Sequence, residues 1–162
     1  MNTSRTNSGG WNGSNMRTKI LGSSYTPTSP LSGSLLAALP SDLRAVMKSV
    51  SKYTDNTGGG SDAASYVTST TEYLPLPSEF EILGVRSYAN SAEQTYQKQD
   101  DYYVAGNSKV AYKHNATTTT VWWWLRSPRY TSTDHFVAVG TDGSGNGNSA
   151  SWSAALRPCF FT

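Results

Sequence analysis

The spacing of the hydrophobic positions changes near the middle of the chain. In the first half, apolar residues recur every three to four positions over short stretches, as at residues 14–21 (SNMRTKIL), which is typical of helices. Ser14 is suited to cap this helix and Gly22 to end it. From Val110 onward the pattern is that of strands separated by turns. The chain is therefore predicted to be an α+β domain, with short helices from its N-terminal half packed on a twisted antiparallel sheet formed mainly by its C-terminal half.

Two more short helices are expected in residues 34–50 (SLLAALPSDLRAVMKSV). Pro40 separates them, because the residue before a proline avoids the helical conformation. The second helix carries an apolar stripe at positions i, i+3, i+4 and i+7, which predicts packing against the core. The stripe consists of Leu43, Val46, Met47 and Val50.

The middle of the chain is predicted to contain one strand and one short helix. Residues 51–65, which include three consecutive glycines, are expected to form a mobile loop, and residues 66–73 (YVTSTTEY) a strand. Ser78 and Glu81 have the spacing of a capping box, which predicts the start of a short helix. The polar stretch 87–109 is expected to wrap the surface.

Strands dominate the expected structure of the second half. Asp142-Gly143, within the glycine-rich turn region 141–150, is a strong signal for a hairpin turn. Pro158 predicts that the last strand lies at a sheet edge or ends there. The predicted strands are residues 111–114, 121–126, 136–140 and 154–161.

The three consecutive tryptophans are expected to alternate between the two faces of one strand. Trp122 and Trp124 are large enough to bury about 150–250 Å² each at the centre of the domain. Arg126 and Arg157 lie near the ends of two strands that we expect to be neighbours, and we interpret both as structural residues that bind carbonyls or a carboxylate. One strand face carries Trp122, Trp124 and Arg126, and the other carries Val121, Trp123 and Leu125.

Length and composition limit the class of protein. The 162 residues suffice for one domain, expected at residues 11–162, and residues 1–10 have the composition of a linker or module edge. Lys and Arg number 13 and Asp and Glu 11, a balance that argues against electrostatic binding to nucleic acid. No apolar run reaches the ~18 residues of a membrane span. Uncharged polar residues are abundant, with 24 Ser, 19 Thr and 10 Asn, so much of the surface is expected to be polar and uncharged.

The motifs indicate neither a catalytic group nor a cofactor. Cys159 is the only cysteine, which excludes an intrachain disulfide and a thiolate zinc cluster. His114 and His135 lack the close spacing of zinc ligands. Asp142 opens a stretch that imitates the start of a calcium loop, but the twelfth position is Ser153 where such loops have glutamate. A metal site is therefore not expected, and weak calcium binding at 142–148 is left open.

Two polar loops between strand signals are suited to recognition. Residues 129–136 (RYTSTDHF) and 145–153 (GNGNSASWS) combine aromatic rings with hydroxyl, amide and imidazole groups. Such side chains offer stacking faces and adaptable hydrogen bonds, as antibody paratopes do. The candidate ligand-binding residues are Tyr130, Thr131, Thr133, Asp134, His135, Asn146, Asn148, Ser151, Trp152 and Ser153.

Several motifs resemble a domain family of gut bacteria and their phages. The family has the signature WWLRSP, then a polar aromatic stretch, then an Arg-Pro-x-Phe element near the end. Here these are WWWLRSP at 122–128 and LRPCF at 156–160. The segments GGWNGSNMR at 9–17 and LPLPSEFEILG at 74–84, together with residues 39–60, fit the same family, so that the resemblance covers nearly the whole chain.

This family is in turn similar to the C-type-lectin-like fold of formylglycine-generating-enzyme type, which the variable proteins of diversity-generating retroelements also use. The resemblance implies a twisted sheet that displays a hypervariable ligand-binding face, often on a phage fibre or a bacterial surface protein. The diversified positions would fall among residues 130–135 and 146–153. The enzyme branch of the fold depends on two active-site cysteines, and the single Cys159 argues against that activity.

The resemblance and the polar loops lead to one expected function. We expect a non-enzymatic recognition domain for a host-surface glycan or protein, located on a phage virion or at the bacterial cell surface. Assembly as a homo-oligomer through a larger parent protein is compatible with this expectation. The alternatives are a structural decoration or assembly module of a virion and, less favoured, an enzyme on the same fold that uses Asp134 and His135.

Overall fold

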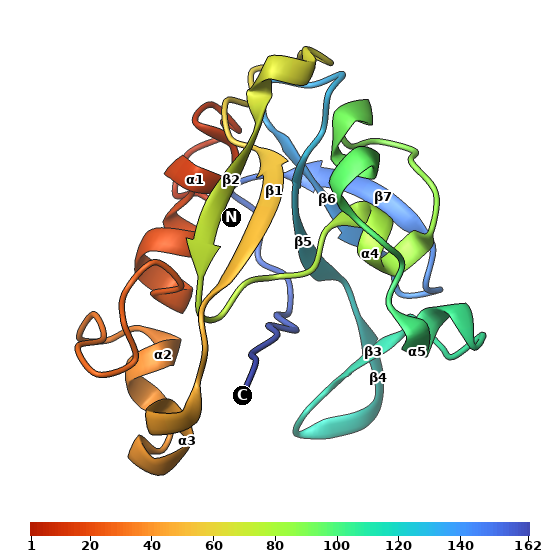
Figure 1. The fold of residues 1–162 in the computed structure, drawn as a ribbon. Helices are drawn as coiled ribbons and strands as arrows, with labels where there is room; N and C mark the ends of the chain where they lie inside the picture. The colour runs from red at the N-terminus through yellow and green to blue at the C-terminus, as the bar shows by residue number, and fades with distance from the viewer.

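The computed structural model describes residues 1–162 as an α+β domain of short helices and small antiparallel sheets (Figure 1). None of the helices has the length and apolar character that crossing a bilayer requires. The helices are α1 (Gly10–Gly13), the π-helix η1 (Met16–Leu21), α2 (Leu35–Ala38), α3 (Ser41–Val46), the 3₁₀ helix η2 (Ala64–Tyr66), α4 (Glu79–Leu83), the 3₁₀ helix η3 (Ser91–Tyr96) and α5 (Asp101–Val104). The strands are β1 (Val50–Asp55), β2 (Val67–Glu72), β3 (Ala111–Lys113), β4 (Ala116–Val121), β5 (Trp123–Pro128), β6 (His135–Val139) and β7 (Gly145–Ser149).

The strands form three separate antiparallel units. Strand β1 pairs with β2, β3 pairs with β4, and β5, β6 and β7 form a sheet in that order. In Figure 1, helices α1 to α3 lie along one side of the β1–β2 pair, whereas α4 and α5 lie on the opposite side of the molecule. The β3–β4 hairpin and the C-terminus lie at its lower end.

Strand β5 is buried along its whole length and separates two hydrophobic clusters. Trp124 packs into the first cluster with Phe136, and Trp123 packs into the second with Val137. Because neighbouring residues of a strand point to opposite faces, one strand supplies the centre of both clusters. The alternation predicted for residues 121–126 is confirmed.

Helix boundaries follow the expected local signals. Gly22 ends η1 in the left-handed region, at φ 68°, and Pro40 separates α2 from α3. The capping box of α4 is present, since Ser78 Oγ accepts from the Glu81 amide and the Glu81 carboxylate accepts from the Ser78 amide. Local signals thus predict the end of η1, the break at Pro40 and the start of α4. The start of η1 differs, because its N-cap is Asn15, although Ser14 Oγ accepts from the Arg17 amide as a capping side chain does.

The apolar stripe predicted at residues 43–50 does not form a buried helix face. Helix α3 ends at Val46, and Val50 already belongs to β1. Met47 is buried, but Val46 is 53% exposed. The prediction was wrong because a helical period extends only as far as the helix, and α3 has fewer than two turns.

Residues 1–10 are packed into the domain, in contrast to the linker interpretation. Met1 is 4% exposed and belongs to the first hydrophobic cluster. Asn7 is fully buried, and its amide group bonds to the backbone of the 129–135 loop. A polar segment can be buried when its hydrogen bonds are satisfied, which composition alone does not reveal.

Two segments expected as loop or turn are strands. Residues 50–55 form β1, in which Thr54 and Asp55 are buried. Residues 145–149 form β7, so that the predicted hairpin turn at Asp142-Gly143 is shorter than expected. Glycine and asparagine weaken the strand signal of β7, but pairing with the apolar β6 outweighs that weak propensity.

The strand expected at residues 154–161 is absent. This segment makes only isolated bridges, one between Ala155 and Trp123 and one between Phe161 and Lys48. Pro158 has no amide hydrogen to donate, so a continuous ladder is interrupted there. Arg157 nevertheless has a structural contact, because its guanidinium lies 4.8 Å from the centre of the Trp123 ring.

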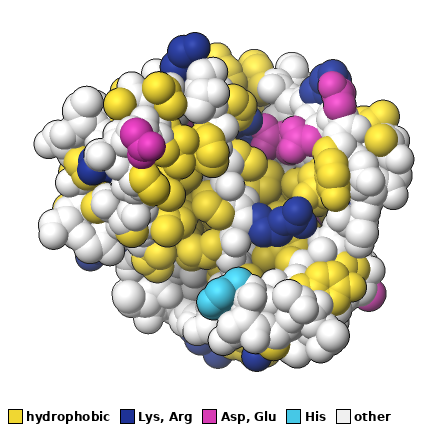
Figure 2. Space-filling model, turned by 90° about the horizontal axis from the view of Figure 1, so that it is seen from below, with side chains coloured by type: hydrophobic (Ala, Val, Ile, Leu, Met, Phe, Trp, Pro, Cys, Tyr) yellow, Lys and Arg dark blue, Asp and Glu magenta, His cyan; other side chains and the backbone are white.

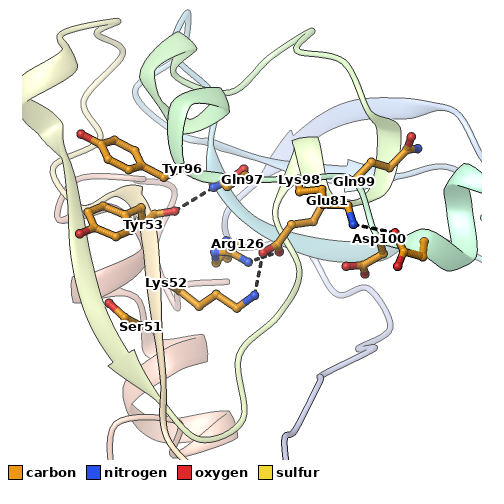
Figure 3. Close-up of a pocket in the computed structure, with 11 residues that line it drawn as sticks. Ser51, Lys52, Tyr53, Glu81, Tyr96, Gln97, Lys98, Gln99, Asp100 and Arg126 are labelled. Carbon is orange, nitrogen blue, oxygen red and sulfur yellow. Dashed lines mark hydrogen bonds and ion pairs between the residues drawn. The ribbon is translucent and has the colours of Figure 1, made fainter.

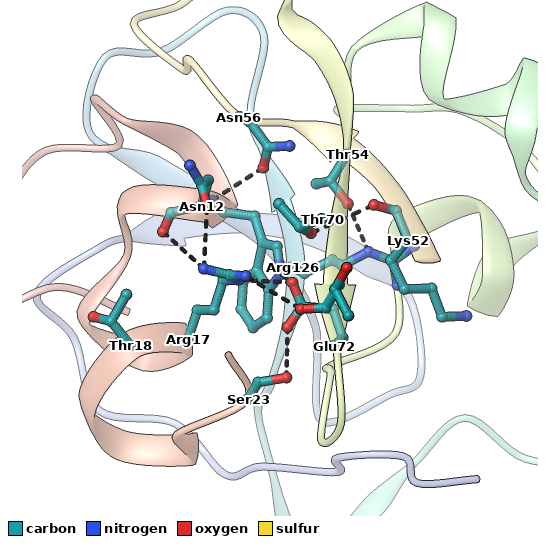
Figure 4. Close-up of polar contacts among 12 residues, drawn as sticks. Asn12, Arg17, Thr18, Ser23, Lys52, Thr54, Asn56, Thr70, Glu72 and Arg126 are labelled. Carbon is teal, nitrogen blue, oxygen red and sulfur yellow. Dashed lines mark hydrogen bonds and ion pairs between the residues drawn. The ribbon is translucent and has the colours of Figure 1, made fainter. Parts of the chain in front are cut away.

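A buried carboxylate joins the N-terminal helices to β2 (Figure 4). Glu72 Oε1 accepts from Arg17 Nε at 2.6 Å and from Trp11 Nε1 at 3.1 Å, and Oε2 accepts from Ser23 Oγ at 2.5 Å. Figure 4 shows Arg17 and Ser23 pointing at Glu72 from the helical side. Glu72 is fully buried and Arg17 is 8% exposed, so each charge depends on the other.

We predict that Glu72→Gln lowers the free energy of unfolding by about 3 kcal/mol, because it leaves the Arg17 guanidinium buried without a counter-ion. Urea denaturation measures the change. The control is Asp101→Asn, which removes an exposed ion pair with Lys98 and should cost less than about 1 kcal/mol. Equal effects of the two substitutions would contradict the assignment.

Candidate functional site

A surface groove of about 440 Å³ lies beside the outer strand β7. Its residues come from three parts of the chain: the N-terminal segment, the Trp122 position just before β5, and the β6–β7 hairpin with the loop that follows it. The strand register pairs Asn148 with Phe136 and Asn146 with Ala138, so that both amides extend from well-ordered sheet positions. The lining residues are Arg5, Trp122, His135, Asn146, Gly147, Asn148, Ser149 and Trp152.

The groove brings together four of the ten predicted ligand-binding residues. They are His135, Asn146, Asn148 and Trp152, which come from the two loops singled out in the sequence. Trp152 is 63% exposed, the largest exposed fraction among the tryptophans. Ser151 and Ser153 line a neighbouring apolar depression, which shares Trp152 with the groove and also contains Trp124.

The remaining predicted residues do not line the groove. The Tyr130 ring stacks under the Arg86 guanidinium at 4.0 Å. Thr131 Oγ1 accepts from Arg129 Nε at 2.9 Å, and the carbonyl of Thr133 accepts from the Asn7 amide at 2.9 Å. These three residues shape the loop, and the structure does not bring them to the groove.

Four lining residues were missed in the sequence. Arg5 was assigned to the linker, and Trp122 was placed at the domain centre, although it is only partly buried against the first cluster. Gly147 and Ser149 carry no distinctive signal. Gly147 matters sterically, since a Cβ there would lie 3.0 Å from the side chain of Arg129. The one sequence signal that could have identified a missed residue is the position of Trp122 directly before two other tryptophans.

Asp134 binds the side chains of His135 and Arg5 at the edge of the groove. Its Oδ1 lies 2.6 Å from His135 Nδ1 and its Oδ2 lies 3.0 Å from Arg5 Nη2. Hydrogen bonds from Ser132, His135 and Arg5 lower the pKa of Asp134 to about 2. Ser132 Oγ also contacts His135 Nδ1, at 2.9 Å. This differs from a catalytic triad, in which the acid and the serine bind opposite ring nitrogens.

Asn7 fixes the conformation of the 129–135 loop. Its Nδ2 group donates to the carbonyls of Ser132 at 2.7 Å, His135 at 2.9 Å and Arg129 at 3.4 Å. Its Oδ1 accepts from the amide of Gly59 at 2.9 Å. One buried side chain therefore ties three points of the loop to the segment that follows β1.

We predict that Asn7→Ala loosens the 129–135 loop, because three carbonyls lose the hydrogen bond from its Nδ2 group and Ser132 loses its only donor. Hydrogen exchange should accelerate at least tenfold at the backbone amides of residue 7, Arg129 and Ser132, while exchange in β2 stays unchanged. The control substitution is Asn107→Ala, which removes an exposed local bond to Tyr102. Unchanged exchange in the loop would refute the role given to Asn7.

A second cavity, of about 290 Å³, is lined mainly by charged and polar side chains (Figure 3). Lys52 Nζ lies 2.7 Å from Glu81 Oε1, and Arg126 Nη1 lies 2.5 Å from Glu81 Oε2. Figure 3 shows both cations pointing at Glu81. The positive charges of Arg126 and Lys52 outweigh burial and lower the pKa of Glu81 to about 2. Arg126 is fully buried and also binds Thr54 Oγ1 and the Leu76 carbonyl, which agrees with its expected structural role.

Glu93 lies close to this charged cluster, in a stretch that was expected on the surface. It is 1% exposed, and it accepts from the Asp55 amide at 3.0 Å and from Ser127 Oγ at 2.7 Å. Burial raises its pKa to about 7, against the opposite effect of these hydrogen bonds and of Arg126. Glu93 therefore binds a proton in the folded protein at a pH where the unfolded chain has already lost it.

We predict that stability falls between about pH 4.5 and pH 7 because of Glu93. The raised pKa stabilises the fold fully below pH 4.5, and this contribution, of up to about 3 kcal/mol, is lost as pH rises through 7. Glu93→Gln should flatten this decline, as measured by urea denaturation at pH 5 and pH 7.5. Asp42→Asn, at an exposed carboxylate, is the control. Parallel pH profiles for the wild type and Glu93→Gln would contradict the prediction.

Fold and groove together define a small α+β domain with a surface groove lined mainly by polar residues and, apart from it, a cavity lined by ion pairs of the protein itself. The chain belongs to the family described as Domain of unknown function (DUF6273), whose model matches residues 1–161. No curated protein and no solved structure matches the chain.

Proposed function

We propose that the chain is a non-enzymatic recognition domain that binds a glycan in the groove beside β7. The observation that carries this proposal is the exposed ring of Trp152 next to the amides of Asn146 and Asn148. An exposed aromatic ring stacks on the apolar face of a sugar, and nearby amides bond to its hydroxyl groups. The groove volume of about 440 Å³ is within the range of small-molecule sites, ~300–1,000 Å³.

The position of these groups favours recognition by a preformed surface. Asn146 and Asn148 belong to β7, and His135 is the first residue of β6, so hydrogen bonds between strands fix their backbone. Asn7 fixes the loop that precedes β6. A ligand that binds to side chains on an ordered backbone loses less free energy in ordering the protein.

The biological setting proposed here follows the family resemblance. We propose a C-type-lectin-like domain on a phage virion or at the bacterial cell surface, with the groove as its ligand-binding face and a host-surface glycan as its ligand. Residues 146–153 would then be the positions where relatives differ in specificity. A protein ligand is the competing outcome of the binding experiment below.

A glycan array and a host-cell binding screen test the proposal. The double variant Asn146→Ala/Trp152→Ala should lose at least tenfold in affinity, about 1.4 kcal/mol or more, because it removes the stacking ring and one amide. Both residues are exposed, so the thermal midpoint should shift by less than about 2 °C. The control is Tyr25→Ala, at an aromatic ring that is 40% exposed in the loop between η1 and α2.

Three results are informative in that screen. Glycan binding that the double variant loses and the control keeps supports the proposal. Binding that the double variant keeps would place the site elsewhere on the molecule. Binding only to host-cell proteins, or no binding at all, would overturn the glycan-binding function.

An apolar face favours self-assembly as a second candidate function. Seen from below, hydrophobic side chains gather in the middle of the surface, around a basic group at its centre and acidic side chains beside it (Figure 2). The elements at this end are α3, the β3–β4 hairpin and the C-terminal segment, which expose Val46, Tyr112 and Phe160. Sedimentation at increasing concentration would detect an oligomer, and Phe160→Ser should weaken it. A monomer at all concentrations would exclude this candidate.

A further inference from the structure

The side-chain polar groups that line the groove and have no partner within the protein are mostly hydrogen-bond donors. The Oδ1 atom of Asn146 accepts from the Gly147 amide at 2.7 Å, and Oδ1 of Asn148 accepts from the Ser149 amide at 3.1 Å. Each asparagine therefore has its oxygen engaged and its Nδ2 group available. Trp122 and Trp152 add two indole N–H groups that donate to no protein atom. An indole N–H can donate but cannot accept.

The charged side chains around the groove favour an anionic ligand as well. Arg5 lines it with a side chain that is 72% exposed, and only Nη2 is engaged, by Asp134. Arg129 lies directly behind Gly147. No aspartate or glutamate lines the groove, and Asp134 at its edge is already bonded to Arg5, His135 and Ser132.

We infer that the groove binds an acidic glycan, a saccharide that carries a carboxylate or a sulfate group. This inference rests on the glycan-binding function proposed above and specifies its ligand. An anionic oxygen accepts several hydrogen bonds and donates none, which matches two amide N–H groups, two indole N–H groups and a guanidinium. The hydroxyl groups of a neutral sugar accept from the same donors, but each also has a proton to donate, and the free side-chain acceptors of the groove are only Ser149 Oγ and Nε2 of His135.

Trp152 lines two depressions, which would divide the ligand between them. One is the groove with its donors, and the other is an apolar depression of about 290 Å³ lined by Met16, Ile20 and Leu156 among others. The sugar ring would stack on Trp152 with its anionic group toward Asn148 and Arg5. Its less polar edge would face Met16 and Ile20.

Matched pairs of acidic and neutral saccharides test the inference by titration calorimetry. The first set is 3′-sialyllactose and 3′-sulfolactose against lactose, which separates a carboxylate from a sulfate on one core. The second set is trigalacturonic acid against its methyl ester. At least one acidic member should bind five times more tightly than its neutral partner, and 0.5 M salt should reduce the difference.

Two variants locate the effect. Arg5→Gln should weaken the preferred acidic ligand at least fivefold and leave the neutral partner unchanged. Asn148→Asp, which replaces a donor by a negative charge, should abolish acidic binding. The control is Lys98→Gln, at a cation whose side chain is 80% exposed but which lines the other cavity. Circular dichroism and the thermal midpoint establish that each variant folds.

The failure of this inference differs from the failure of the proposed function. Neutral saccharides that bind as well as acidic ones, and lose binding in Trp152→Ala, would overturn the acidic preference and leave glycan binding intact. Absence of binding to every member of both sets would overturn the inference. A preference for acidic members that Arg5→Gln and Asn148→Asp leave unchanged would also contradict it.

Discussion

The alternation of three consecutive tryptophans organises this protein. Trp124 enters the first hydrophobic cluster, Trp123 enters the second, and Trp122 reaches the surface groove. Since β5 is buried on both faces, the two clusters share one backbone and cannot shift independently. The groove wall is therefore anchored directly to the most buried part of the domain, which keeps a surface site rigid although it lies among loops.

Buried carboxylates provide the second structural support. All four glutamates of the chain are buried, each with its own set of donors. Glu72 binds Arg17 and Glu81 binds Arg126, while Glu79 accepts from three consecutive amides at 87–89. Of 73 backbone hydrogen bonds, 40 lie in turns, loops and caps, so regular ladders supply fewer than half. Because so little of this fold is regular helix or strand, buried carboxylates accept the hydrogen bonds of loop amides that have no partner in a helix or sheet.

Local signals in the sequence were sufficient to predict those structural features that depend only on neighbouring residues. The capping box at Ser78, the stop at Gly22, the break at Pro40 and the two faces of β5 were all predictable. Strand β7 was not, since its GNGNS sequence has weak strand propensity and depends on pairing with β6. The packing of residues 1–10 depends on contacts of Asn7 with residues more than 120 positions away, which no local pattern encodes.

The sequence predicts which two loops contribute to the groove, but it does not predict every residue that lines it. Asn146, Asn148, His135 and Trp152 belong to stretches whose polar and aromatic content pointed to recognition. Arg5 and Trp122 join them only through the tertiary fold. Tyr130, Thr131 and Thr133 share the same composition but are engaged within the protein, because a loop side chain can serve the loop itself as readily as a ligand.

The most direct measurement of the central claim is a nitrogen-15 NMR titration with each of the three acidic saccharides, 3′-sialyllactose, 3′-sulfolactose and trigalacturonic acid, that follows side-chain N–H signals. The indole signals of Trp122 and Trp152 and the amide signals of Asn146 and Asn148 should shift together with one dissociation constant. The indole signals of Trp11 and Trp123, which donate to Glu72 and to the Lys109 carbonyl, should stay in place. Shifts confined to Gln97 and Gln99 in the charged cavity, or no shifts at any of these groups, would contradict the account.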